Sequence, residues 1–322
     1  MEDYPRTLGE LEARFSTEDA CLEYLSQLRW PEGFRCPRCG HAKGWPVGNS
    51  LIECEACGYQ ASITSGTIFH RTRKPLTVWF RAIWWVTSQK TGASALGLQT
   101  ILGLGSYKTA WAWLHRLRRA MVRPGRERLS GTVEVDETYW GASETNVRGR
   151  ETGKKSLIAV AVEERGKRLG RIRMQSIPDA SAPSLEGFVL EAIEPGSTVR
   201  TDGWEGYSRL DRRGYRHEVK VISRSQQKAS QLLPYVHRVV ALLKNWLRGT
   251  HQGAISSEHL DYYLDEFTFR FNRRTSRYRG KLFYRLLQNT ILVEPITYQQ
   301  MIKNIRGRKP KKGHTIYRVY LT

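Results

Sequence analysis

Two aspartates and a histidine have residue types and surroundings that suit metal chemistry. Asp136 lies in the alternating run 132–139, which predicts a strand, and Asp202 directly follows a second strand-like run, 197–201. His237 lies further on, in a helix-like stretch. Two carboxylates at strand ends and a third ligand on a helix can hold a pair of hard cations, which stabilise the attacking and leaving oxygens of a phosphodiester displacement. The pattern therefore predicts a site for phosphoryl transfer.

Four of the five cysteines form two pairs of the type C-x-x-C. They are Cys36 and Cys39, followed by glycine at 40, and Cys54 and Cys57, followed by glycine at 58. Each pair can present two thiolates on a tight turn, and two such turns complete a tetrahedral four-sulfur shell. Because a closed shell of this kind is structural, the pattern predicts a zinc ribbon whose Zn²⁺ stabilises the fold. His41 or His70 could replace one thiolate, although surface positions are the simpler interpretation of both histidines.

The charge of the chain points to a polyanionic partner. Its 322 residues carry a formal net charge of +21, with 52 Lys and Arg against 31 Asp and Glu. Such an excess predicts binding to nucleic acid that weakens as salt increases. Paired cysteines favour a reducing compartment, and neither a signal peptide nor a membrane-spanning apolar run is evident. We therefore expect a cytoplasmic, nucleoid-associated protein.

The pattern of apolar residues changes near residue 130. Before it, helical spacing is found at 1–30 and again at 75–123, on either side of the cysteine segment. After it, strand-like runs lie at 131–139, 156–163, 168–176, 197–201 and 217–222, and helix candidates lie at 182–193, 233–248 and 257–272. Three successive strands followed by alternating helix and strand indicate a mixed α/β sheet flanked by helices.

The segment 91–111 resembles a helix-turn-helix. Apolar residues would pack the first helix, glycines at 103 and 105 would make the turn, and Ser106 would cap a second helix running to about residue 121. That second helix would reach phosphates and base edges. The residues available for this contact are Tyr107, Lys108, His115, Arg116, Arg118 and Arg119. The alternative is a basic helical hairpin that only packs against the rest of the chain.

Several longer stretches, in their order and spacing, resemble the DDE-type transposases of insertion sequences, specifically the zinc-ribbon group with an ISXO2-like catalytic module. These stretches are 94–99, 102–111, 133–139, 201–204, 249–253 and 263–274. With the cysteine pairs, the resemblance covers nearly the whole chain. It implies a ribonuclease-H-like fold, in which one aspartate lies on the central first strand, another follows the fourth strand and the third ligand lies on a later helix. Asp136, Asp202 and His237 occupy these positions.

The third ligand is the most variable position of this pattern. Many DDE enzymes have glutamate there, whereas alignment on the run from Lys244 to Leu247 places His237 at this position. Lys244 follows His237 by about two helical turns, so the two side chains would share a face, with His237 toward metal and Lys244 toward phosphate. Imidazole is softer than carboxylate and suits Mn²⁺ at least as well as Mg²⁺. Glu266 and Glu258 remain alternatives for the third ligand.

The resemblance implies an enzyme that binds the terminal inverted repeats of an insertion sequence. Asp136 would bridge two Mg²⁺ or Mn²⁺ ions, while Asp202 and His237 would each complete one of them. Hydrolysis of one strand would free a 3′-hydroxyl, which would attack target DNA at the same site. Phosphates would also be gripped at a basic helix end, by Arg270, Arg273 and Arg274. A dimer or higher oligomer on double-stranded DNA is implied, and the alternatives are an inactive DNA-binding regulator and a nuclease or resolvase of the same fold.

These observations divide the chain into five predicted parts. They are an N-terminal helical segment (1–30), a zinc ribbon (31–72), a helix-turn-helix DNA-binding region (73–125), a ribonuclease-H-like DDE-type transposase domain (128–290) and a basic C-terminal tail (291–322). The predicted fold class is an α/β catalytic domain with a mixed sheet flanked by helices, preceded by a zinc ribbon and a helix-turn-helix.

Overall fold

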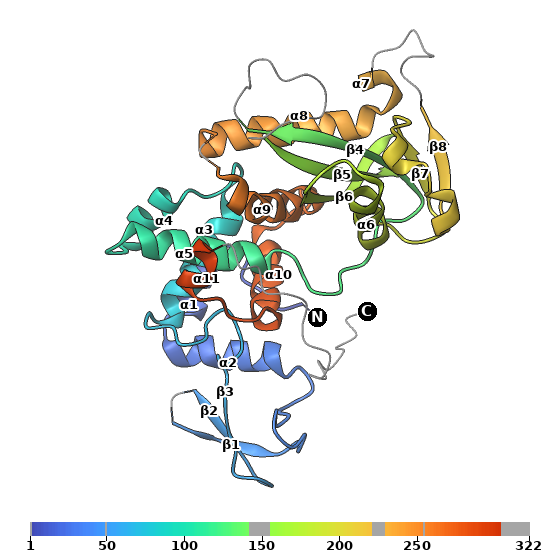
Figure 1. Cartoon of the computed structure of the whole chain (residues 1–322). Coiled ribbons are helices and arrows are strands. Elements are labelled where there is room, and N and C mark those ends of the chain that lie inside the picture. Colours follow the sequence, from blue (N-terminus) through green and yellow to red (C-terminus); the bar gives the residue numbers. More distant parts are fainter. Residues whose placement is uncertain (1, 49, 142–154, 221–228, 254, 304–322) are drawn as a thin grey trace.

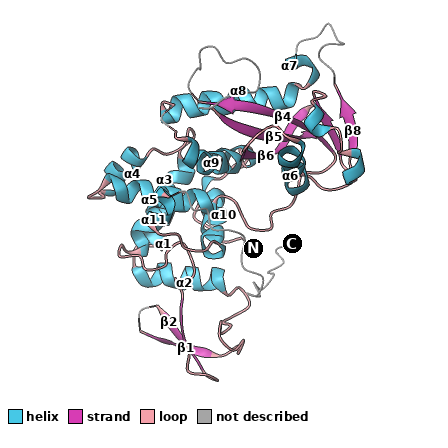
Figure 2. Cartoon of the chain, viewed as in Figure 1, coloured by secondary structure: helices cyan, strands magenta, loops and turns pink. Residues whose placement is uncertain are grey.

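A computed structural model describes residues 2–48, 50–141, 155–220, 229–253 and 255–303 (Figure 1). A three-stranded sheet lies at one end of the molecule and a five-stranded sheet at the other, and helices fill the space between them (Figure 2). Most of the predicted basic tail lies outside the described residues. Among the described residues, no helix has the length and apolar character needed to span a membrane.

Two helices precede the small sheet, and a threonine caps the N-terminus of each. They are α1 (Leu8–Arg14) and α2 (Glu18–Arg29). The hydroxyls of Thr7 and Thr17 accept hydrogen bonds from backbone amides of the first helical turn, which satisfies donors that would otherwise lack partners. The small antiparallel sheet follows, with β1 (Gly44–Val47), β2 (Leu51–Cys54) and β3 (Gln60–Ser62) in that order.

A helical core lies between the two sheets. Its helices are α3 (Leu76–Ser88), α4 (Ala95–Leu102), α5 (Tyr107–Ala120) and α10 (Arg279–Leu292), and α1 and α2 pack against them. The indole rings of Trp79 and Trp113 stack with centroids 3.5 Å apart, which joins α3 to α5. A short helix, α11 (Tyr298–Ile302), packs near the side of α5. Our sequence interpretation overlooked α10, although Leu282, Phe283, Leu286 and Leu287 recur at helical spacing and are buried.

The large sheet is mixed. Its strands are β4 (Thr132–Trp140), β5 (Ser156–Arg165), β6 (Arg168–Ile177), β7 (Thr198–Thr201) and β8 (Arg216–Val219). The spatial order is β6-β5-β4-β7-β8, with β4, β5 and β6 antiparallel and β7 and β8 parallel to β4. The predicted strands and the mixed character of the sheet are thus confirmed.

Helices cover both faces of this sheet. Helix α6 (Ala182–Ala192) packs on one face, and α8 (Pro234–His251) and α9 (Leu260–Asn272) pack on the other. Shorter elements are α7 (Ala229–Leu232), η1 (Glu205–Tyr207), η2 (Asp211–Arg213) and η4 (Ser257–His259). Alternation along β4 explains the two cores, because Val133 and Val135 belong to the α6 side and Trp140 to the α8 side. Asp136 shares the α8 side with Trp140.

Candidate active site and zinc centre

Parallel pairing of the central strand with its neighbour brings the two predicted aspartates together. Strand β4 pairs with β7 in a register that places Glu134 opposite Arg200. Two positions further along each strand, Asp136 and Asp202 lie side by side at the end of β7. Asp202 is held in a tight turn, since its Oδ1 accepts a hydrogen bond of 3.0 Å from the amide of Trp204. Both carboxylates are partly exposed and so open to solvent.

Helix α8 supplies the basic side of the site. His237 Nε2 lies 3.7 Å from Asp136 Oδ2. The pKa of His237 is lowered by burial, the Asp202 carboxylate acts against this change, and Lys244 adds to it. The pKa of Lys244 is lowered by burial and by Arg248, with Asp136 opposing. His237 and Lys244 therefore both face the aspartates, and a neutral imidazole is the form that can accept a metal ion.

A fourth residue, Glu134, connects the central strand to α8. Its Oε2 accepts a hydrogen bond of 2.8 Å from the amide of Val236, in the first turn of the helix. Burial raises the pKa of the Glu134 carboxyl to about 7, although bonds from the helix amides stabilise its charged form. One side chain thus anchors the start of α8, immediately before His237, to the strand that carries Asp136. We overlooked it in the sequence, where only its alternation with Asp136 on one strand face could have indicated a role.

The opposite face of the strand carries Glu137. Its Oε2 accepts a hydrogen bond of 2.9 Å from the hydroxyl of Tyr207, which is fully buried. Burial raises the pKa of Tyr207 well above its usual range, and the nearby carboxylates of Glu137 and Asp136 add to this effect. Glu137 and Tyr207 therefore lie on the α6 side of the sheet, behind the strand that carries Asp136. Because side chains alternate along a strand, Glu137 points away from the face that carries Asp136.

The donor atoms of Asp136, Asp202 and His237 suit hard divalent ions, because two carboxylates and an imidazole are ligands for Mg²⁺ and Mn²⁺. Their arrangement is open. Within the described ranges, the four cysteines are the only group of three or more potential ligands whose atoms all lie within 4.8 Å of one another. Asp136, Asp202 and His237 would have to hold two ions rather than enclose one, and the ions would supply positive charge for phosphoryl transfer.

The zinc centre is closed. Sulfurs of Cys36 and Cys57 are 3.7 Å apart, and those of Cys39 and Cys54 are 3.5 Å apart. A regular tetrahedron with Zn–S bonds of about 2.3 Å would place its sulfurs about 3.8 Å apart, so the four thiolates fit one Zn²⁺. Each knuckle is closed by a glycine amide, from Gly40 to the Cys36 carbonyl and from Gly58 to the Cys54 carbonyl. Both glycines have positive φ, 77° and 62°, which explains their place after the cysteine pairs.

The two histidines beside the ribbon do not complete this shell, which four cysteines already form. His41 Nε2 lies 3.1 Å from Glu55 Oε2 at the surface. His70 is only partly buried. The thiol of Cys21 is buried within the helical core, where burial and Glu18 raise its pKa to about 12. This fifth cysteine is therefore a core residue.

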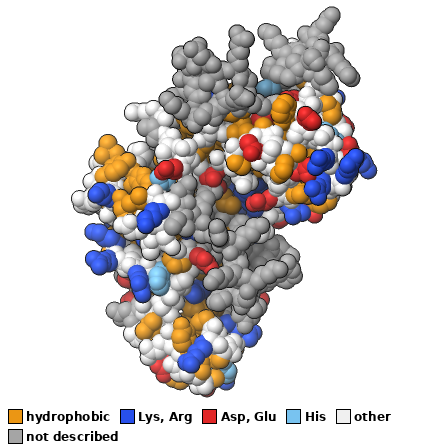
Figure 3. All heavy atoms as spheres, viewed as in Figure 1, with side chains coloured by type: hydrophobic (Ala, Val, Ile, Leu, Met, Phe, Trp, Pro, Cys, Tyr) orange, Lys and Arg blue, Asp and Glu red, His pale blue; other side chains and the backbone are white. Residues whose placement is uncertain are grey.

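The predicted DNA-reading helices have the expected bounds. Helix α4 ends at Gly103 in the left-handed conformation, and α5 begins after Ser106, whose side chain makes no capping hydrogen bond. At the start of α5, Tyr107 and Lys108 are exposed. Apolar side chains gather over α4, with basic side chains around them (Figure 3). Leu96 and Ile101 are the large apolar residues there, 63% and 60% exposed.

Two of the residues predicted to contact DNA are buried, which corrects that part of the sequence interpretation. His115 lies among aromatic rings, including Trp111 and Tyr262. Arg118 Nε donates a hydrogen bond of 2.8 Å to Glu266 Oε2 on α9. Neither side chain reaches the surface, because α5 is covered by other helices on more than one side. Arg116 and Arg119 are partly exposed.

The basic end of α9 is also largely engaged within the protein. Arg270 binds Glu266 Oε1 and donates to the carbonyls of Gln89 and Val86 at 2.7 Å each. Arg274 donates to carbonyls of Leu169 and Gly170, and Arg273 stacks on the ring of Phe269 at 4.2 Å. Glu266 is thus held between two arginines, which leaves no free carboxylate for a metal ion. Glu258, the other alternative ligand, is exposed.

The strand order β6-β5-β4-β7-β8 is that expected of a ribonuclease-H-like fold, and a comparison with known families assigns the class of the domain. Residues 128–272 match the ISXO2-like transposase domain, and residues 16–60 match the transposase zinc-ribbon domain. An uncharacterized protein in the transposable element ISH50 of Halobacterium salinarum is 26% identical over 298 residues, which cover 86% of this chain and 98% of that protein. The chain therefore carries a zinc-ribbon domain and an ISXO2-like domain that match those of insertion-sequence transposases.

Proposed function

We propose that this protein binds the terminal inverted repeats of an insertion sequence, cuts one strand at each end and joins the freed 3′-hydroxyl to target DNA. The observation that carries the proposal is the meeting of Asp136 and His237, 3.7 Å apart, beside Asp202. These potential ligands come from β4, the end of β7 and α8 of the matched domain. Metal-dependent phosphoryl transfer is the chemistry that such a donor set serves.

Asp136, Asp202 and His237 would hold two Mg²⁺ or Mn²⁺ ions, with Asp136 between them. When bound, the ions supply positive charge for the attacking and leaving oxygens of the phosphodiester. Lys244, on the same face of α8 as His237, would bind a non-bridging phosphate oxygen. Glu134 holds the first turn of α8, so His237 keeps its place as the phosphate enters. Positioning and charge neutralisation therefore supply most of the catalysis.

The zinc ribbon and the exposed start of α5 are the proposed DNA-binding elements. Tyr107 and Lys108 would contact phosphates or base edges, with Arg116 and Arg119 further along the same helix. The net charge of +21 supports a DNA partner and predicts affinity that falls steeply with salt. Two transposon ends must be brought together, so we expect a dimer or higher oligomer on DNA.

The decisive experiment is a cleavage and joining assay on labelled transposon-end DNA with Mg²⁺ or Mn²⁺. Asp136→Ala, Asp202→Ala and His237→Ala should each bind the ends but cut at least about 100-fold more slowly. His237→Glu should keep activity and shift the preference toward Mg²⁺, because carboxylate is the harder ligand. Glu258→Ala, at an exposed position, is the matched control and should behave as the wild type.

Other outcomes of this assay would redirect the proposal. If only His237→Ala stays active, the third ligand lies elsewhere. If the wild-type protein cuts but never joins strands, it is a nuclease or resolvase. The histidine at a position where many DDE enzymes have glutamate favours a second candidate, an inactive DNA-binding regulator. The protein is such a regulator if the wild type binds the transposon ends but cuts them with neither Mg²⁺ nor Mn²⁺.

A further inference from the structure

A cavity of about 760 Å³ lies between the helical core and the large sheet, on the β6 side. Its walls come from the linker between α5 and β4, the edge strand β6, the end of α9 and the helix α10. We call it the arginine cavity, because six arginines line it. They are Arg123, Arg126, Arg171, Arg173, Arg273 and Arg285.

The arginine cavity is separate from the proposed active site. Arg173 pairs across the sheet with Ala161, and Ala161 pairs with Val135, so Arg173 shares the strand face of Val135. Asp136 points to the opposite face of the sheet, toward α8. The edge strand β6 is also two strands away from β4. The residues proposed for catalysis therefore do not line this cavity.

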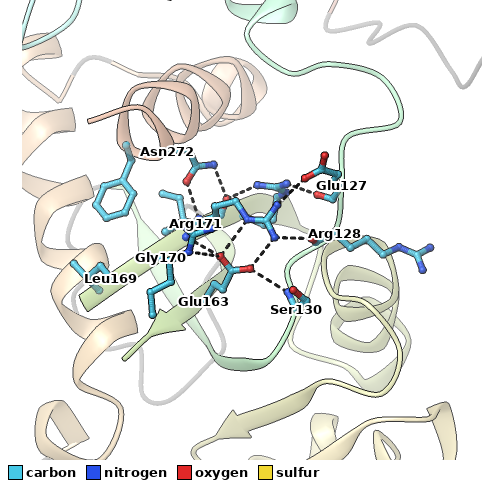
Figure 4. Close-up of polar contacts among 12 residues, drawn as sticks. Glu127, Arg128, Ser130, Glu163, Leu169, Gly170, Arg171 and Asn272 are labelled. Atoms are coloured by element: carbon cyan, nitrogen blue, oxygen red, sulfur yellow. Dashed lines mark hydrogen bonds and ion pairs between the residues drawn. The ribbon is translucent and has the colours of Figure 1, made fainter. Parts of the chain in front are cut away.

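Positive charge in the cavity exceeds negative charge. Two carboxylates, Glu2 and Glu127, face the six guanidinium groups. Arg171 is well compensated, with Glu163 at 2.7 Å and Glu127 at 3.1 Å (Figure 4). In contrast, four of the arginines form no ion pair with Glu2 or Glu127 in the described part of the chain. They are Arg123, Arg126, Arg173 and Arg273. Asp265 and Glu191 nevertheless act on the pKa of Arg126, and Glu163 and Glu127 on that of Arg173.

Like charges crowd together on two walls. The pKa of Arg173 is lowered to about 9 by burial and then by Arg126 and Arg171. The pKa of Arg273 is lowered to about 10 by burial and then by Arg285 and Arg123. Guanidinium groups that outnumber the carboxylates beside them repel one another, and an anion bound among them would relieve this repulsion. The crowding therefore points to a ligand with several negative charges.

Two of the arginines on the β6 wall are held in place by backbone carbonyls. Arg173 donates hydrogen bonds to the carbonyls of Ile172, at 2.9 Å, and Glu127, at 2.5 Å. Arg171 also donates to the carbonyl of Arg128 at 3.1 Å (Figure 4). Asn272 accepts from the amide of Ile172 at 2.8 Å, which fixes the end of α9 against the edge strand. Preorganised donors lose little conformational entropy when they bind a phosphate group.

We propose that the arginine cavity binds a single strand of DNA through its phosphates. The volume lies within the range of about 300–1,000 Å³ that is typical of ligand pockets, which admits a short stretch of one strand and not a duplex. Two walls of guanidinium groups match a chain of repeated charges better than one isolated phosphate. The proposal rests on the proposed function only in that the protein handles DNA.

The N-terminal segment supplies an internal stand-in for the ligand. One carboxylate oxygen of Glu2 is paired with Arg285, and the other lies 3.2 Å from Lys281 Nζ. The partner of Arg285 is therefore a side chain of the N-terminal segment, not a residue of the large sheet. An incoming phosphate would displace Glu2 from Arg285, so removing this carboxylate should strengthen binding.

The test measures binding of a fluorescein-labelled single-stranded oligonucleotide by anisotropy, with the full-length protein. The variant Arg126→Gln/Arg273→Gln removes one arginine from each crowded group. We expect the Kd to rise at least about tenfold and the slope of log K against log salt to fall by about 1.4, about 0.7 for each lost phosphate contact. Glu2→Gln should bind the strand more tightly than the wild type. Arg209→Gln/Arg212→Gln, at two exposed positions near η2, is the matched control for lost charge and should change the Kd little.

A thermal melt of the same variants separates a binding site from a structural cluster. Removing crowded like charges should leave the Tm of Arg126→Gln/Arg273→Gln unchanged or raise it, whereas loss of structural residues would lower it. Unchanged single-strand affinity in this variant would overturn the proposal. An equal loss of affinity for a duplex of the same sequence would also overturn it, because the cavity would then be part of a duplex-binding surface.

Two further measurements identify the ligand and distinguish a failure of this proposal from a failure of the proposed function. If inorganic tripolyphosphate displaces the strand as well as unlabelled strand does at equal phosphate concentration, the site takes free oligophosphates and the proposal fails. If the variant loses the single strand while the wild-type protein never cuts transposon ends, the proposed function fails and the arginine cavity stands. Cutting of ends by the wild type, with no effect of the variant on the strand, would reject the cavity alone.

Discussion

Glu266 lies at the centre of a buried ion network that joins α5 to α9, and its removal should destabilise the folded protein. Its side chain is 1% exposed and that of Arg118 is 3% exposed. Arg118 and Arg270 both lie 2.8 Å from its carboxylate oxygens. Glu266→Ala would leave two guanidinium groups without their anion, one fully buried and one nearly so. Breaking such a network costs about 3–5 kcal/mol in measured cases.

The pKa of Glu266 gives a similar magnitude. Burial alone would raise it, but Arg270 and Arg118 outweigh burial and lower it from the ordinary 4.5 to about 2. A difference of this size corresponds to about 3 kcal/mol of stabilisation of the charged form in the folded protein. With a loss of about 3–5 kcal/mol, we expect Glu266→Ala to lower the Tm by on the order of 10 °C.

A thermal melt without added divalent metal is the assay, and Glu258→Ala is the control. Glu258 is exposed and lies on η4, directly before α9, so its loss should shift the Tm by less than about 2 °C. The Tm of Glu266→Gln should lie between those of Glu266→Ala and Glu258→Ala, because the Gln amide oxygen still accepts one hydrogen bond but carries no charge. A Tm for Glu266→Ala that matches the wild type, together with lost metal-dependent cleavage, would refute the reasoning and make Glu266 the third metal ligand.

The sign of the pH dependence follows from the lowered pKa. The stabilisation from Glu266 is fully present above the unfolded value near 4.5 and is lost as pH falls toward 2. The Tm difference between the wild type and Glu266→Ala should therefore shrink as pH falls from about 5 to about 3. A difference that stays constant over this range would show that lost packing, not lost charge, causes the destabilisation.

Three further predictions concern other parts of the molecule. Removal of zinc with a chelator, or Cys54→Ser, should unfold the ribbon and release one Zn²⁺ per chain, measured by a colorimetric chelator and circular dichroism, while Cys21→Ser should release none. Glu134→Ala should lower the free energy of unfolding by about 0.5–2 kcal/mol, because the hydrogen bond from the Val236 amide is lost, and should raise the Mn²⁺ concentration needed for cleavage. Glu134→Gln should keep both properties close to those of the wild type, because its amide oxygen can accept the same hydrogen bond. Lys108→Ala should weaken duplex binding uniformly across sequences and reduce the salt slope by about 0.9, whereas Lys303→Ala should have no comparable effect.

The sequence was sufficient to predict the sheet and the pair of aspartates. The run 156–163 is almost continuously apolar, which is typical of a strand with buried residues on both faces, and the run 132–139 also has buried residues on both faces. The position of Asp202 relative to Asp136 was implied by the family resemblance, and the parallel register of β4 and β7 agrees with it. The strands could be predicted here because their burial determines which positions are apolar.

The same reasoning failed where a basic residue is buried. On α5, the spacing that makes Arg118 available for DNA also makes it available for Glu266, which lies far away along the chain. No local pattern distinguishes the two, because the choice depends on a tertiary partner. Helix α10 was overlooked for a related reason, since arginine, lysine and glutamine between its apolar positions made it resemble a solvated segment. Buried carboxylates such as Glu134 are equally inconspicuous until the helix that they cap is in place.

The buried contacts also bear on how DNA binding would reach the proposed active site. Trp246 and Thr250, near the end of α8, donate hydrogen bonds of 2.7 and 2.6 Å to the carbonyl of Thr91, just before α4. Gly92 follows with a φ of +100°, and a Cβ there would meet the Trp246 side chain at 3.1 Å. His237 lies about 14 Å from Trp246 and about 20 Å from Thr250 along the same helix. Because α8 is one continuous rod fixed to β4 at its start and to this loop near its end, a displacement of α4 and α5 on DNA must either move His237 or break these bonds.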